Sequence, residues 1–201
     1  MEKFSIIMPS YLGDFHKRAA KSRKEKFVRA VDSVIEQTYS DWKLYVIADG
    51  CPYTAELLKN YRDDRIVLIE IERNKPYSGI PRNIGLLAAT GEWMIYLDTD
   101  DMFIDSYLER LSTSLGNLNW YWVNDIWFSK GTFRERRCSI NALGHCGTSN
   151  VIHKPGILWT EKPTYAHDYV FIKDLKRKWP NTEFVDVAGY CVMHIPNLYD
   201  M

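Results

Sequence analysis

An apolar run that ends in three carboxylates constrains this chain more than any other feature of its sequence. A buried strand is indicated by Trp93-Met94-Ile95-Tyr96-Leu97, because a strand covered on both faces is a short, continuous apolar run. Asp98, Asp100 and Asp101 follow at once. Carboxylates crowded at one strand end repel one another unless a cation lies between them. Mg²⁺ and similar ions bind through one or two carboxylates plus substrate phosphates. The run therefore predicts a metal and a phosphorylated ligand at a sheet edge, with an acidic turn that caps the next helix as the alternative.

Strands and helices alternate through the first half of the chain. Short apolar runs predict strands over 4–9, 44–48, 66–71 and 93–97, the first of them stopped by Pro9. Helices are predicted from a capping box of Ser22 and Glu25, over 57–61, and from Pro81 to Thr90. This alternation implies a largely parallel sheet with right-handed crossovers. Ligands of such sheets bind at the carboxyl ends of the strands.

The second half of the chain has a different pattern. We expect a helix over 104–115, one aromatic-rich strand over 120–128, a flexible stretch over 144–150, a helix over 166–178 and a strand over 190–194. No linker, internal repeat or low-complexity tract interrupts the 201 residues. A single domain is therefore expected.

Composition narrows the class of protein. Because the net charge is zero, no nucleic-acid partner is expected. Aromatic residues make up 14% of the chain, enough to line a sugar site, although filling the core is the favoured interpretation.

The four cysteines form no metal-binding pair, so reduced thiols are expected, with a Cys138–Cys146 bridge as the alternative. No signal peptide or membrane span is evident, which favours a cytoplasmic location. The basic stretch over 17–29 is interpreted as a solvated helix face, with contact to a diphosphate, to an anionic acceptor or to a membrane surface as the alternatives.

Several motifs taken together resemble the inverting glycosyltransferases of family 2, which have the GT-A fold. The matching segments are Met8-Pro9-Ser10-Tyr11, Asp49-Gly50, Pro81-Arg82-Asn83-Ile84-Gly85, Ala89-Thr90-Gly91-Glu92 and Leu97-Asp98-Thr99-Asp100-Asp101. The resemblance implies a single α/β domain over 1–201, with a mostly parallel central sheet flanked by helices and a smaller acceptor-side region. In this interpretation residues 1–115 bind the nucleotide sugar and residues 116–201 form the acceptor side.

The same resemblance implies a reaction and its partners. The enzyme would be a metal-dependent glycosyltransferase that moves a sugar to a hydroxyl group in one displacement, with inversion. Its donor would be a UDP-, dTDP- or GDP-sugar, its acceptor a glycan or another hydroxyl compound, and its cofactor Mn²⁺ or Mg²⁺. The nucleotide sugar is assigned to Pro9, Ser10, Tyr11, Asp49, Arg82, Asn83, Asp98 and Thr99, and the metal to Asp98, Asp100 and His194.

Asp168 is the expected catalytic base. The family places a Glu-Asp pair at a helix start, and this chain has His167-Asp168 there, with His167 in place of the glutamate. A carboxylate within reach of an acceptor hydroxyl can take its proton, although Asp also favours a helix N-cap. Gly147, Thr148 and His167 are the expected acceptor-side residues.

Two other functions compete with transfer. A non-catalytic or degenerate sugar-nucleotide-binding module would use the same strand ends but would need no base at Asp168. An Asp-x-Asp phosphatase of the haloacid dehalogenase type is disfavoured because its motif lies near the N-terminus and is followed by Thr or Val, whereas Met102 follows here. A dinucleotide-binding domain is excluded by the lack of Gly-x-Gly-x-x-Gly after any strand.

Overall fold

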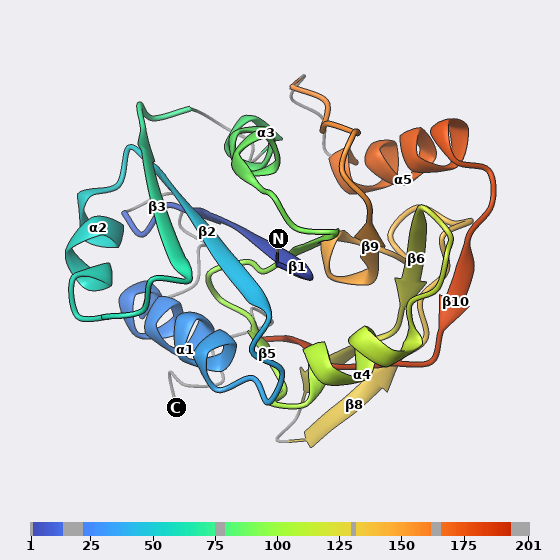
Figure 1. Ribbon diagram of the computed structural model, residues 1–201, viewed down its shortest axis with the longest axis horizontal. Helices are drawn as coiled ribbons and strands as arrows, with labels where there is room; N and C mark the ends of the chain where they lie inside the picture. Colours follow the sequence, from blue (N-terminus) through green and yellow to red (C-terminus); the bar gives the residue numbers. More distant parts are fainter. Residues whose placement is uncertain (1, 14–21, 75–78, 130–131, 162–165, 194–201) are drawn as a thin grey trace.

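A mixed seven-stranded sheet organises the molecule (Figure 1). The computed structural model describes residues 2–13, 22–74, 79–129, 132–161 and 166–193. In spatial order the strands are β10 (Glu183–Val185), β6 (Trp120–Val123), β9 (Val151–His153), β4 (Trp93–Tyr96), β1 (Phe4–Ser10), β2 (Trp42–Asp49) and β3 (Ile66–Ile71). Only the pairs that involve β9 are antiparallel. The predicted α/β fold with a mostly parallel central sheet is therefore confirmed.

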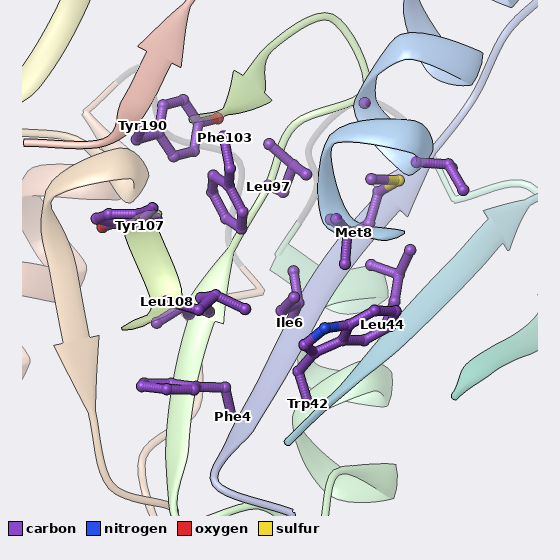
Figure 2. Close-up of a cluster of buried hydrophobic side chains, with 14 of the residues drawn as sticks. Phe4, Ile6, Met8, Trp42, Leu44, Leu97, Phe103, Tyr107, Leu108 and Tyr190 are labelled. Atoms are coloured by element: carbon purple, nitrogen blue, oxygen red, sulfur yellow. The ribbon is translucent and has the colours of Figure 1, made fainter. Parts of the chain in front are cut away.

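Helices cover both faces of this sheet because side chains along β1 alternate between them. Phe4, Ile6 and Met8 pack with α1 (Arg23–Ile35), α2 (Pro52–Leu58) and α4 (Tyr107–Ser114). Figure 2 shows the centre of this cluster, where Trp42 and Leu108 flank the first strand. On the other face, Ile7 packs with α3 (Gly79–Ala88) and α5 (His167–Lys178). Many of the aromatic residues fill the core, as the favoured interpretation expected, including Trp42, Trp93 and Trp120.

A second, four-stranded sheet was not predicted. Its order is β5 (Met102–Phe103), β11 (Tyr190–Val192), β7 (Asp125–Ser129) and β8 (Thr132–Arg136). The single strand expected over 120–128 is wrong, because the chain leaves the first sheet after Val123 and enters the second at Asp125. Asn124 fixes this crossing, since its amide donates to Glu135 Oε1 at 2.6 Å and accepts from the backbone N–H of Cys138 at 3.0 Å.

Three local expectations are corrected. Pro9 does not stop β1, which runs to Ser10; pairing with β4 ends at Ile7, so the missing N–H of proline costs no hydrogen bond there. Helix α1 begins after Ser22 as expected, but Ser22 has a left-handed backbone (φ 51°) and no side-chain capping bond. The stretch expected to be flexible holds a 3₁₀ turn, η1 (Thr148–Asn150), that leads into β9.

The cysteines agree with expectation, whereas the helix expected over 57–61 is wrong in its position, because α2 runs over Pro52–Leu58. All four thiols are free and buried, so the alternative Cys138–Cys146 bridge is not formed. Within the described segments, no helix combines the length and apolar character needed to traverse a lipid bilayer.

Candidate active site

A cavity of about 470 Å³ lies where β1, β2 and β4 end. Most of the predicted site residues line it, and they come from strand ends, from α3 and from the start of α5. The lining residues are Pro9, Ser10, Tyr11, Arg23, Asp49, Arg73, Asn74, Pro81, Arg82, Asp98, Thr99, Asp100, Thr148, His167 and Asp168. The topology therefore gathers side chains from both halves of the chain around one space, as expected for a sheet of this type.

One corner of the cavity is built on Asp49. Its carboxylate forms an ion pair with Arg73 and accepts the backbone N–H of Asn74 at 2.6 Å. The Arg73 guanidinium lies 3.6 Å from the ring centroid of Tyr11. Gly50 permits this corner because its φ is +60° and a Cβ atom would lie 2.8 Å from the Arg73 backbone nitrogen. The result is a guanidinium stacked over a flat ring, a surface suited to a nucleobase and its phosphates.

The acidic loop after β4 separates into cavity and core residues. Asp98 and Asp100 line the cavity, whereas Asp101 is 2% exposed. Asp101 accepts hydrogen bonds from the Tyr190 hydroxyl at 2.7 Å and from the backbone N–H of Met193 at 2.6 Å. Tyr190 in turn accepts the backbone N–H of Asp98 at 3.1 Å. Asp101 therefore anchors the loop to β11, so that Asp98 and Asp100 are held toward the cavity.

The electrostatics of Asp98 favour a nearby cation. Burial raises the pKa of its carboxyl group, the Arg82 guanidinium lowers it, and the carboxylates of Asp101 and Asp168 raise it further. The net direction is upward, so the charged form is stabilised incompletely by the protein alone. A bound cation would complete that stabilisation.

The donor set fits a metal ion only in part. His194, the third expected ligand, lies outside the described residues. Among the described side chains, no group of three or more His, Cys, Asp or Glu residues is arranged to hold a metal. Asp98 and Asp100 nevertheless fit an ion whose remaining ligands are water and substrate phosphate, which is how Mg²⁺ is usually bound.

Arg82 connects the acidic loop to Thr148 and His167. It is 3% exposed and comes from the first turns of α3. Its Nη2 donates to Asp98 Oδ1 at 3.0 Å and to Thr148 Oγ1 at 3.4 Å, and its Nη1 lies 3.1 Å from His167 Nε2. The forked guanidinium can hold these groups together, which a lysine ammonium could not do in the same geometry.

The Trp159 ring packs against the Arg82 guanidinium, a contact that the sequence did not predict. The Arg82 guanidinium lies 4.6 Å from the centroid of the Trp159 ring. The same indole ring also stacks on Phe171, with the two ring centroids 4.0 Å apart. Asn83 brackets the backbone of Trp159 with hydrogen bonds of 2.7 and 3.0 Å. Asn83 was expected to contact the nucleotide sugar, but it does not line the cavity. It instead holds Trp159 in place against Arg82, the residue that precedes Asn83 in the sequence.

A buried polar chain continues behind Trp159. The indole N–H donates to the Tyr96 hydroxyl at 2.9 Å, and Tyr96 lies 2.7 Å from Nε2 of His153. His153 Nδ1 lies 2.8 Å from the carbonyl oxygen of Lys154. Since a carbonyl only accepts, Nδ1 carries the proton and Nε2 accepts from Tyr96. Burial lowers the pKa of His153 to about 4, so this ring is neutral at physiological pH.

Asp168 lies at the opening of α5 beside His167. The N-cap of this helix is Ala166, so the alternative interpretation of Asp168 as the N-cap is wrong. His167 Nε2 lies 3.0 Å from Asp168 Oδ1. Burial by itself raises the pKa of Asp168, but the neighbouring His167 and Thr148 side chains and the charge of Arg82 outweigh it and leave the pKa below its ordinary value. Asp168 is therefore a carboxylate, able to accept a proton, at neutral pH.

Gly147 lies directly against this carboxylate without lining the cavity. A Cβ atom there would lie 3.5 Å from Asp168 Oδ2. The expected acceptor-side residues thus surround Asp168, with Thr148 and His167 facing the cavity.

Four residues that line the cavity were not among the predicted site residues, namely Arg23, Arg73, Asn74 and Pro81. Arg73 and Asn74 follow β3, whose carboxyl end could have been included by the same strand-end rule that selected Asp49. Arg23 begins α1 and donates to the carbonyl oxygen of Gly13 at 2.8 Å. The interpretation of the basic stretch as a solvated face is therefore wrong for Arg23, and also for Lys26, which is 3% exposed.

Comparisons with known proteins give a consistent result. The sequence profile of glycosyl transferase family 2 matches residues 5–139. The chain is 36% identical over 115 residues to the Escherichia coli UDP-Glc:alpha-D-GlcNAc-diphosphoundecaprenol beta-1,3-glucosyltransferase WfgD, which covers 56% of this chain and 41% of that protein. It is 30% identical over 116 residues to the Staphylococcus aureus poly(ribitol-phosphate) beta-N-acetylglucosaminyltransferase TarP, covering 55% and 32% of the two chains. The chain thus spans less than half the length of these relatives.

Solved structures extend the similarity to nearly the whole fold. Residues 1–349 of S. aureus TarS in complex with UDP superimpose with a TM-score of 0.78 at 18% identity, over 94% of this chain and 60% of that one. The mannosyltransferase PcManGT from Pyrobaculum calidifontis, in complex with GDP-Man and Mn²⁺, gives a TM-score of 0.62 at 13% identity, over 98% and 58%. At these identities the superpositions establish the fold, which is GT-A.

Proposed function

This chain belongs to glycosyl transferase family 2, and we propose that its cavity transfers a sugar from a nucleotide diphosphate sugar to a hydroxyl acceptor, with a divalent metal and with inversion. The observation that carries the proposal is the set of charged residues that line the cavity at the strand ends. It combines the carboxylates Asp98 and Asp100, the guanidinium groups of Arg23, Arg73 and Arg82, and a separate carboxylate at Asp168. Charges of both signs are what a metal–diphosphate donor and a proton-accepting base require.

The charged residues of the cavity indicate where the phosphates and the nucleobase of the donor would bind. Arg23 and Arg73 offer positive charge to the two phosphates, and Tyr11 offers a ring on which the base can stack. Asp49 retains acceptor capacity for a base N–H, because each carboxylate oxygen accepts more than one hydrogen bond. UDP, UDP-GlcNAc and GDP-Man are bound by structural neighbours, which supports a donor of this class.

A divalent ion, when bound by Asp98, Asp100 and the donor phosphates, would neutralise negative charge on the leaving diphosphate. The presence of Mn²⁺ in the complex of PcManGT supports Mn²⁺ or Mg²⁺ here. Arg82 adds fixed positive charge that needs no reorganisation during the reaction, since Trp159, Asp98 and His167 already hold it.

The chemical step uses Asp168 as the base. The acceptor oxygen attacks the anomeric carbon, its proton passes to the Asp168 carboxylate, and the bond from the anomeric carbon to the diphosphate oxygen breaks with its electron pair. His167 and Thr148 orient the carboxylate and keep it ionised. Asp98 and Asp100 are committed to the phosphate side, and Asp49 to Arg73 and the nucleobase, so no second carboxylate of the cavity is left to act as a nucleophile. One displacement inverts the anomeric centre, and a non-catalytic binding module would have no use for Asp168 in this position.

A donor screen tests the proposal. A ligand that binds only the folded protein raises its stability, by about 2.7 kcal/mol at a hundred times its dissociation constant. UDP-, dTDP- and GDP-sugars should be compared by thermal unfolding with Mn²⁺ and with a chelator. We expect donors with one of the three nucleobases to stabilise the protein in the presence of the metal. An unfolding midpoint that no donor changes would contradict the proposal.

A further inference from the structure

A second cavity, of about 340 Å³, lies in the acceptor-side half and shares no lining residue with the first. The size is at the lower end of the range of about 300–1,000 Å³ typical of small-molecule sites. Its walls come from β6, β8, β10 and the segments that follow them. The lining residues are Trp122, Asn124, Glu135, Arg137, Cys138, Phe184 and Asp186.

Two aromatic rings form one wall of this cavity. Trp122 on β6 and Phe184 on β10 are direct neighbours in the parallel register, and their ring centroids lie 4.7 Å apart. Strand β10 is the last strand of the large sheet, so nothing in the described chain pairs with its outer edge (Figure 1). Phe184 is 41% exposed. The pair therefore presents apolar ring surface inside a hollow that is otherwise polar.

The polar groups of the cavity are held in place by a buried amide. Asn124 is 6% exposed, donates to Glu135 Oε1 at 2.6 Å and accepts the backbone N–H of Cys138 at 3.0 Å. Successive side chains of β8 point to opposite faces, and Arg136 is directed toward Asp125, with which it forms an ion pair at 2.5 Å. Glu135 therefore faces the cavity in a fixed position.

The charges of the lining restrict the ligand. Glu135 and Asp186 accept hydrogen bonds and repel anions, whereas Arg137 donates hydrogen bonds and repels cations. A neutral molecule with many hydroxyl groups satisfies both kinds of side chain, because a hydroxyl both donates and accepts. An apolar face on the same molecule would pack against Trp122 and Phe184.

We propose that this cavity binds a neutral sugar ring of a glycan, as a second carbohydrate site distinct from the cavity that contains Asp168. The ring would pack its C–H face on the Trp122–Phe184 wall and direct its hydroxyls to Glu135, Asp186 and Arg137. This binding does not depend on the transfer reaction and requires neither metal nor nucleotide.

The test is an NMR titration of the whole chain with cellobiose and with chitobiose, two neutral disaccharides. The reporter is the indole N–H signal of Trp122, assigned by its loss in Trp122→Phe. We expect one of the disaccharides to give a saturable shift. Phe184→Ala should weaken this binding about tenfold, in line with the loss of ring packing. Glu135→Gln, an exposed change that spares the core, should weaken it severalfold even if Phe184→Ala fails to fold.

Two matched controls place the ligand. Phe133→Ala removes another exposed phenylalanine, on β8 and outside the cavity, and should leave the affinity unchanged. Asp168→Asn alters only the first cavity and should also leave it unchanged. The proposal is overturned if neither disaccharide shifts the Trp122 signal, if tetramethylammonium saturates the site while the sugars do not, or if Asp168→Asn weakens binding and the cavity variants do not.

Discussion

Acidification should destabilise the fold through His153, the buried histidine behind the active site. Its Nδ1 proton is held by the Lys154 carbonyl and its Nε2 accepts from Tyr96, so a second proton, on Nε2, would take away the acceptor of the Tyr96 hydroxyl proton. Burial lowers the pKa from 6.5 to about 4. Because the unfolded chain binds this proton more tightly, stability is complete above the unfolded pKa and falls as the pH drops from about 6.5 toward 4.

The size of the effect follows from these two pKa values. Between neutral pH and about pH 5, the loss attributable to His153 is about 2 kcal/mol, and it approaches about 3 kcal/mol once the pH falls below the folded pKa. Asp168 and Asp63, whose pKa values are lowered in the folded protein, also lose stabilisation in acid. Their contribution is common to the wild type and to variants at other sites, so it cancels in a difference.

The assay is urea unfolding of the wild type and of His153→Gln across this pH range. Glutamine keeps an acceptor for Tyr96 but does not titrate, so the stability advantage of the wild type should shrink by about 2 kcal/mol between neutral pH and about pH 5. His145→Gln, which changes an exposed histidine, is the matched control and should follow the wild type. Parallel curves for the wild type and His153→Gln would refute the reasoning.

Four further variants test the active-site geometry. Asp100→Ala should weaken metal-dependent nucleotide binding, measured by calorimetry. Asp101→Ala should instead lower the free energy of unfolding by about 1.5–3 kcal/mol or more, because two hydrogen bonds to a buried carboxylate are lost. Equal effects of the two variants on stability would contradict their separate roles. Arg82→Lys should reduce transfer about tenfold to a hundredfold, because one ammonium cannot replace contacts to both Asp98 and His167, and unchanged turnover would remove Arg82 from the mechanism. Gly50→Ala should lower the free energy of unfolding by about 1–3 kcal/mol, because alanine rarely adopts the positive φ of Gly50. An unchanged midpoint in thermal unfolding would show that this position tolerates a Cβ atom.

The sequence predicted the first half of the fold well because its strands and helices have simple periodicities. The strands at 44–48, 66–71 and 93–97 all form, and the end of each carries residues of the cavity. The rule that ligands meet the carboxyl ends of parallel strands, together with the family resemblance, predicted that Tyr11, Asp49 and Asp98 share one site.

The parts that could not be predicted depend on contacts between distant segments. Nothing in the run over 120–128 marks Asn124 as the point where the chain changes sheets, since its partners Glu135 and Cys138 come later. The role of Asn83 is hidden for the same reason: its partner Trp159 is 76 residues away. Asp101 resembles Asp98 and Asp100 in sequence, and only its contacts with β11 show that it is an anchor.

The most direct test of the proposed reaction compares binding and transfer in Asp168→Asn. Asparagine preserves the shape of the side chain but cannot accept a proton from the acceptor hydroxyl. Donor affinity, measured by calorimetry with Mn²⁺, should therefore stay close to that of the wild type, while the rate of sugar transfer should fall on the order of 10²–10⁴-fold. Near-wild-type turnover in Asp168→Asn would contradict the account, because the carboxylate beside His167 would then not be the base.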